Sequence, residues 1–131
     1  MYALSTALCT DLDEAVERVR KALQIEGFGV ITEIDMAAVL KAKLGVDMER
    51  YLILGACNPA LAREALDADR HIGLLLPCNV VVRDHPADAG VVIVEALNPD
   101  VMVEVTGVQA LKSVADQVAI KLQAALDSLA G

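Results

Sequence analysis

Two short motifs in the middle of the chain carry the residue types that could do chemistry. Each places an asparagine directly after a cysteine, with a proline beside the pair: Cys57-Asn58-Pro59 and Pro77-Cys78-Asn79. An ionised thiol is a strong nucleophile, and an asparagine side chain can both donate and accept hydrogen bonds. The motifs therefore predict a ligand-binding site formed by Cys57, Asn58, Cys78 and Asn79, with the two cysteines as candidate catalytic residues.

The first motif places a thiol at the start of a helix. Asn58 followed by Pro59 is typical of an N-cap and the first helical position, so Cys57 ends a strand just before the helix. Unpaired backbone N–H groups at a helix start favour negative charge, which is one setting for a reactive thiolate. A free cysteine more often packs as a small hydrophobic residue, however, and capping alone explains Asn58.

The second motif has the same two interpretations. Cys78 follows Pro77 and begins a β-branched run, so it can be a core residue at a strand start. Asn79 can serve to satisfy buried backbone groups there. The functional interpretation rests on the pairing of each asparagine with a cysteine.

Strands on either side of the motifs must position them. Residues 50–57 form one apolar run, and residues 78–84 and 91–97 form two β-branched runs joined by a longer hairpin loop. If the strands that carry Cys57 and Cys78 pair antiparallel, the two thiols lie near each other at the same end of the sheet. The chain has 3 cysteines without dense spacing, which indicates reduced thiols in a cytoplasmic compartment and no permanent disulfide.

The remaining elements follow from hydrophobic periodicity. The pattern predicts strands at 2–9 and 29–35, and helices at about 12–26, 36–44, 59–69 and 108–129. Thr10 or Asp11 can cap the first helix and Gly27 can end it, and Asn98-Pro99 repeats the turn chemistry of Asn58-Pro59 at the end of another strand. This order predicts a single domain over residues 1–131 of the α+β class, with a mainly antiparallel sheet of about five strands and the long N- and C-terminal helices on one face. An uncovered apolar second face would be unusual on a monomer, so we expect a homodimer.

Composition limits the partners. The chain has 11 basic and 19 acidic residues and a net charge of −8, which repels phosphate backbones and anionic headgroups. The longest apolar stretch, 72–82, is shorter than a membrane span, and no targeting segment is recognisable at the start. We therefore expect neither nucleic acid nor a membrane as a partner.

A metal site would need ligands from several parts of the chain. Cys57, Cys78, His71 and His85 carry suitable donor atoms, but no Cys-x-x-Cys or His-x-x-x-His spacing connects any two of them. We therefore predict no metal site and expect both histidines to be solvated. The sequence indicates no particular cofactor.

The two motifs and their surroundings also carry a family resemblance. The residues Gly55-x-Cys57-Asn58-Pro59, followed by the run from Ile72 to Val82, resemble the signature of the domain of unknown function 302 family. The likeness extends along nearly the whole chain, including the turn from Gly27 to Val30. The resemblance implies a compact α+β domain with a curved antiparallel sheet similar to the TATA-binding-protein-like arrangement, usually as a homodimer. It implies no established activity.

Two functions from different classes are compatible with these residues. The first is a homodimeric domain without catalysis that binds a small ligand or partner in a cleft near Cys57 and Cys78. The alternative is a thiol-dependent enzyme or redox sensor that uses Cys57, with Cys78 as its resolving partner. Buried, unreactive thiols would favour the first.

Overall fold

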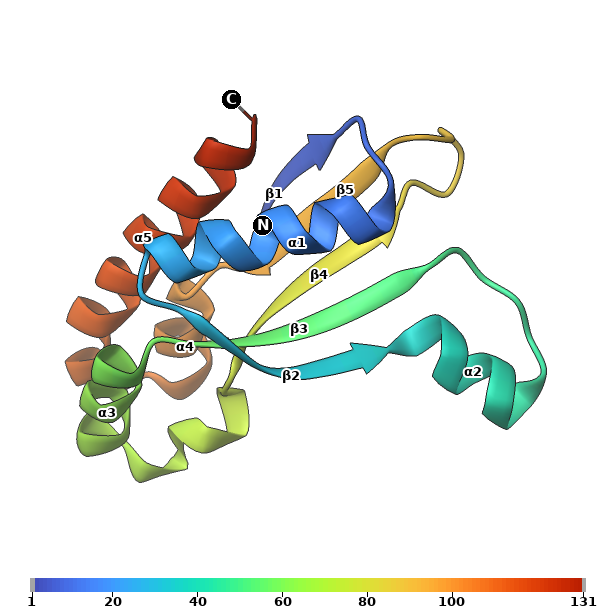
Figure 1. The fold of residues 1–131 in the computed structure, drawn as a ribbon. Helices are drawn as coiled ribbons and strands as arrows, with labels where there is room; N and C mark the ends of the chain where they lie inside the picture. Colours follow the sequence, from blue (N-terminus) through green and yellow to red (C-terminus); the bar gives the residue numbers. More distant parts are fainter. Residues whose placement is uncertain (1, 131) are drawn as a thin grey trace.

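The computed structural model describes residues 2–130, which form one five-stranded antiparallel sheet with helices packed against it (Figure 1). The spatial order is β1-β5-β4-β3-β2, and every neighbouring pair is antiparallel. The strands are β1 (Ala3–Leu8), β2 (Gly29–Asp35), β3 (Tyr51–Cys57), β4 (Cys78–Asp84) and β5 (Val92–Leu97). The expected α+β class and strand number are confirmed.

Five α-helices and two short 3₁₀ helices connect these strands within the described residues. They are α1 (Leu12–Ile25), α2 (Met36–Leu44), α3 (Pro59–Ala68), η1 (Arg70–Leu75), α4 (Asp100–Thr106), η2 (Gln109–Leu111) and α5 (Lys112–Ala130). The long helices α1 and α5 lie over the same face of the sheet, as expected, and α3 and α4 gather where β3 ends and β4 begins (Figure 1). Within residues 2–130, none of the helices combines the length and apolarity that crossing a bilayer requires.

The hydrophobic core lies between the sheet and the two long helices. Along β4 and β5 every second side chain is buried: Cys78, Val80, Val82, Val92, Val94 and Ala96. The helices meet this face with the stripes that their periodicity predicts, and Ala15, Val19, Ala115 and Leu122 are among the buried residues. Burying such aliphatic side chains is worth about 1.5–3 kcal/mol each, so this interface supplies most of the driving force for folding.

Local signals set the ends of α1 as the sequence predicts. The Asp11 carboxylate accepts a hydrogen bond from the Glu14 backbone N–H over 2.8 Å, which caps the first turn. At the other end Gly27 adopts a φ of +87°, a left-handed conformation that favours glycine. The chain thereby reverses and enters β2 within a few residues.

Three connections differ in part from the sequence prediction. The helix expected from residue 108 begins as the separate 3₁₀ turn η2, and α5 itself starts at Lys112. A helical turn follows β5 at Asn98-Pro99, as predicted, but its capping differs from that of Asn58-Pro59: Pro99 occupies the N-cap position of α4, while the Asn98 side chain accepts a hydrogen bond from the Asp100 N–H. The 3₁₀ helix η1 was not predicted, because its six residues are too few to show a helical period.

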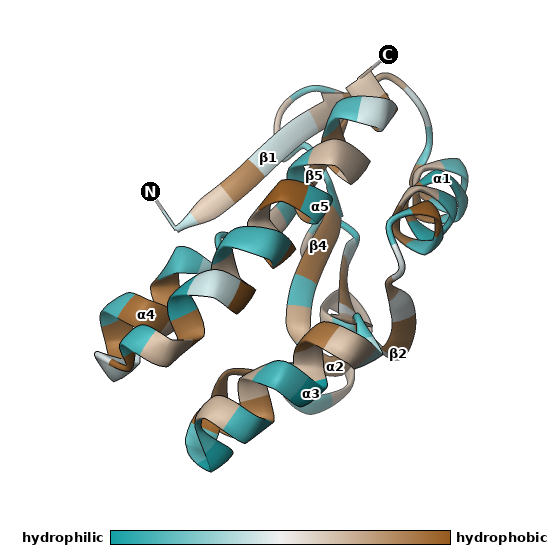
Figure 2. Cartoon of the chain, turned by 90° about the vertical axis from the view of Figure 1, so that its left-hand side faces the viewer, coloured by the Kyte–Doolittle hydropathy of each residue, from teal (hydrophilic) through white to brown (hydrophobic). Residues whose placement is uncertain are grey.

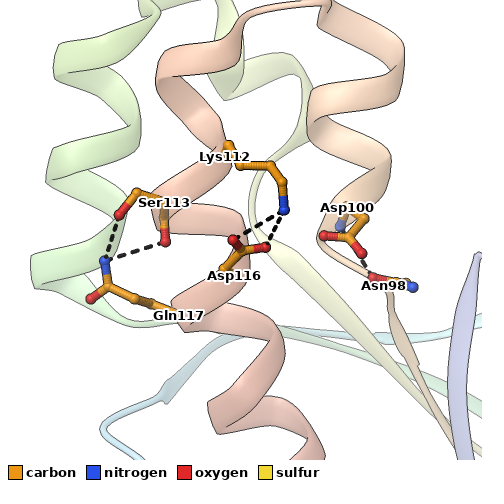
Figure 3. A network of polar contacts seen from close by, with 6 residues as sticks. All are labelled: Asn98, Asp100, Lys112, Ser113, Asp116 and Gln117. Carbon is orange, nitrogen blue, oxygen red and sulfur yellow. Dashed lines mark hydrogen bonds and ion pairs between the residues drawn. The ribbon is translucent and has the colours of Figure 1, made fainter.

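Polar contacts at the start of α5 lie on its solvent side (Figure 3). The Lys112 ammonium donates to both carboxylate oxygens of Asp116, at 2.8 and 3.1 Å, and Gln117 donates to Ser113 one turn away. The hydrogen bond to Asp116 and its charge raise the pKa of Lys112 above its ordinary value. These are exposed contacts between residues four apart, which water and salt screen, so they add little to the stability of the helix.

We predict that Leu122→Ala lowers the free energy of unfolding by about 2–5 kcal/mol, because Leu122 is 1% exposed at the centre of the α5 stripe. Ile120 is the matched control, since it lies on the same helix but is 71% exposed. Ile120→Ala should change stability by less than about 0.5 kcal/mol. Urea titration followed by circular dichroism measures both, and a Leu122→Ala loss as small as that of the control would contradict the assigned helix face.

Candidate functional site

The structure contains an apolar cavity of about 310 Å³ where β3 ends and β4 begins. Its walls come from the ends of these strands, from the helices α3, α4 and α5 and from the start of β2. The lining residues are Phe28, Ile31, Ala56, Cys57, Asn58, Leu61, Ala62, Ala65, Leu66, Leu76, Pro77, Cys78, Met102, Val114 and Val118. Figure 2 views the side of the molecule on which α3, α4 and α5 surround this end of the sheet, with hydrophobic and hydrophilic residues alternating along each helix.

Antiparallel pairing of β3 with β4 brings the two central cysteines to this cavity. The register places Ala56 opposite Cys78, so Cys57 is the next residue along its strand at the same end of the sheet. Both cysteines are free and both line the cavity. The expected proximity of Cys57 and Cys78 follows from this register.

Cys57 and Cys78 occupy different environments. Cys57 is half-buried and directly precedes Asn58, the N-cap of α3, as the sequence indicates. Cys78 is 7% exposed and belongs to the core. Burial first, and the neighbouring Cys57 second, raise the pKa of Cys78 to about 11, so this thiol is neutral at physiological pH.

Asn58 joins two helices at the cavity wall. Its side-chain oxygen accepts a hydrogen bond from the Leu61 N–H over 3.4 Å, and its amide nitrogen donates to the carbonyl of Glu26 over 3.5 Å. The predicted N-cap is therefore present, and the same side chain also holds the end of α1. A side chain at position 27 would meet this amide, since a Cβ built on Gly27 lies 3.0 Å from the Asn58 nitrogen.

The structure does not bring Asn79 to the cavity. Asn79 follows Cys78 in β4, and successive side chains of a strand point to opposite faces. Asn79 is exposed on the outer face of the sheet, in a shallow groove that Tyr2 and Tyr51 also line. Of the four residues predicted to bind ligand, Cys57, Asn58 and Cys78 thus share a cavity and Asn79 lies apart from them.

Neither histidine lines the cavity that holds Cys57 and Cys78. His71 is exposed in η1, and His85 follows β4 at the end opposite Cys78. The Nδ1 atom of His85 accepts hydrogen bonds from the N–H groups of Ala87 and Asp88, both at 3.0 Å. Across residues 2–130, no three His, Cys, Asp or Glu side chains lie close enough together to hold a metal ion.

The sequence does not predict several residues of the cavity wall. Met102 in α4 and Val114 and Val118 in α5 line the cavity, although they are far from both motifs in sequence. Their helical periodicity signals only that they face the interior. The packing of α5 against both α3 and α4 decides that they face this cavity.

Comparison with known families confirms the family resemblance. The family model described as domain of unknown function DUF302 matches residues 4–129. The chain belongs to the DUF302 family. A crystal structure of an uncharacterized conserved DUF302 protein from Bacillus stearothermophilus is similar to this DUF302 chain, with 30% sequence identity, a TM-score of 0.87 and coverage of 97% of each chain. No curated protein matches the chain.

We predict that Cys78 is the slowest of the three cysteines to react with iodoacetamide in the folded protein. Only the thiolate reacts, and a pKa of about 11 in place of the ordinary 9.0 lowers the thiolate fraction of Cys78 at pH 8 by about a hundredfold. Because the pKa is raised, the Cys78 rate should increase about tenfold per pH unit from pH 8 until it levels off near pH 11.

Peptide mass spectrometry after limiting reaction measures the rate at each cysteine. The same series in denaturant is the control, since unfolding removes the burial and should bring the three rates close together. Fast labelling of Cys78 in the folded protein at pH 8 would contradict the assigned burial.

Proposed function

We propose that this DUF302 chain is a small-ligand-binding domain whose site is the cavity beside Cys57 and Cys78. The observation that carries the proposal is the cavity itself, which measures about 310 Å³ and is lined almost entirely by apolar side chains. Pockets for small molecules start at roughly this size and are mostly apolar with few polar groups. Two larger hollows of the molecule, of about 560 and 440 Å³, are lined in part by charged residues such as Arg50, so the apolar lining and not the size distinguishes this cavity.

The position of the cavity supports the same function. Ligand sites in proteins form where several elements meet, and here two strand ends and three helices supply the walls. Buried residues such as Leu61, Ala65 and Met102 hold these walls in the core cluster. The proposed binding residues are Cys57, Asn58 and Cys78, which form the part of the wall that carries sulfur and amide groups.

We predict that small fragments of about ten non-hydrogen atoms shift the backbone amide signals of Ala62, Ala65 and Met102 in ¹H–¹⁵N NMR spectra. Ala62→Phe places a ring in the cavity and should abolish these shifts, because Ala62 is a half-buried lining residue. Ala60→Phe is the matched control, since Ala60 is exposed on the same helix and outside the lining. If fragments of neutral, anionic and cationic character all leave these amides unmoved, the proposed function fails.

A second candidate function uses the same wall. Cys57 is half-buried in the lining, so a molecule in the cavity would lie against its thiol, and a thiol-dependent enzyme or redox sensor could use this residue with Cys78 as resolving partner. The thiol-dependent function requires Cys57 to react with iodoacetamide faster than the exposed Cys9. The alkylation series described above measures both rates, and a slower Cys57 would leave the binding function without the thiol chemistry.

We propose further that two copies of the chain associate through the outer face of the sheet. This face carries Ile53, Val81 and Ile93, which are only partly exposed, and Ile34, which is 44% exposed on the neighbouring strand β2; the Arg83–Glu95 ion pair lies among them. Helix α2 at the edge of this strand buries none of its own residues, and its Leu44 is 70% exposed. Apolar surface of this kind is a common mark of an interface between proteins. The three free cysteines fit a reducing, cytoplasmic setting for such a dimer.

We predict a dimer in sedimentation equilibrium at micromolar concentration. Ile34→Glu should shift it toward monomer, because a charge would be buried in the apolar contact without a partner. Ile120→Glu is the matched control, since it introduces the same charge at a 71% exposed position on α5 and should leave the dimer intact. A purely monomeric wild type would contradict the proposal.

A further inference from the structure

We infer that the ligand of the cavity is an uncharged, largely apolar molecule of about ten non-hydrogen atoms; the inference rests on the proposed function and names its ligand class. It follows from three properties of the lining: its charge, its free hydrogen-bonding capacity and its volume.

The charge of the lining disfavours an ionic group inside the cavity. None of the lining residues, all of which lie in the described part of the chain, is Lys, Arg, His, Asp or Glu. A carboxylate or phosphate in the cavity would lose its hydration without gaining a cationic partner, and an ammonium group would find no carboxylate. The net charge of −8 adds repulsion against anions at longer range.

The lining offers few hydrogen-bonding groups. Asn58 is the one amide side chain there; its oxygen accepts from the Leu61 N–H and its nitrogen donates to the Glu26 carbonyl, which leaves one N–H and one oxygen lone pair for a ligand. The two thiols are weak hydrogen-bonding groups. A ligand with several polar groups would therefore lose more hydrogen bonds with water than the lining can replace, whereas an apolar ligand gains from leaving water.

The volume sets the size of the ligand. A water molecule occupies about 30 Å³ of liquid, so the cavity of about 310 Å³ holds about ten atoms of similar size. The walls are aliphatic apart from Phe28, so they offer little stacking surface and suit an aliphatic chain as well as a small ring.

The test compares three probes that share an eight-carbon chain and differ in charge: octan-1-ol, octanoate and octylammonium, titrated at pH 8. We expect octan-1-ol to shift the amides of Ala62, Ala65 and Met102 and to bind at least tenfold more tightly than either ion. Octan-1-ol binding should be lost in Ala62→Phe and kept in Ala60→Phe. Ala62→Leu replaces the larger substitution if Ala62→Phe does not give a folded spectrum.

A measurement that needs no variant locates the probe. An intermolecular nuclear Overhauser effect between octan-1-ol and the Met102 methyl group is expected, because Met102 lines the cavity. Absence of that effect at saturating octan-1-ol, or binding that Ala62→Phe leaves unchanged, would place the probe elsewhere and overturn the inference.

The outcomes separate this inference from the proposed function. Octanoate or octylammonium binding in the cavity as tightly as octan-1-ol would overturn the ligand class while leaving a ligand-binding cavity. Failure of all three probes together with all the small fragments would overturn both.

Discussion

The antiparallel register between β3 and β4 is the constraint on which the rest of the structure depends. It places Ala56 opposite Cys78 and Gly55 opposite Asn79. Because side chains alternate along a strand, a slip of β3 by one residue against β4 would turn the buried side chains of β3 to the outer face of the sheet. The core against α1 and α5 and the cavity beside the cysteines both require this one alignment.

Gly55 shows how tightly that alignment is packed. A Cβ built at this position would lie 2.0 Å from the Thr32 hydroxyl and 2.7 Å from the Pro77 ring, so neighbours from β2 and from the entry to β4 close over the bare backbone. The glycine that precedes the first cysteine motif thus lets the proline of the second motif approach. The two motifs are therefore parts of one packed unit.

Sequence patterns predicted most of the fold because its signals are local. The capping carboxylate of Asp11, the glycine after α1 and the Asn58-Pro59 helix start each act within a few residues, and the structure contains all three. The proximity of Cys57 and Cys78 needed only the further assumption that their strands are antiparallel neighbours.

The site was harder to predict because it depends on packing and on strand geometry. Grouping Asn79 with Cys78 followed the likeness of the motifs, whereas the alternation of a strand sends these two side chains to opposite faces. The contribution of Met102 and Val114 could not be read from the sequence, because no local pattern states which buried surface a helix will meet. The sequence also could not show that Cys78 is buried and Cys57 only half-buried, because burial depends on the whole fold.

The alanines of α3 have a consequence for selectivity. Ala62 and Ala65 face the cavity from the same helix, with Leu61 and Leu66 beside them, so part of the empty space exists because two side chains stop at the β-carbon. A valine or leucine at either position would reduce the volume of the cavity, and no strand residue, helix cap or cysteine would need to change. Under the proposed function, the length of ligand that fits is set by the size of side chains on a single helix face, and it can change by one substitution while the sheet stays fixed.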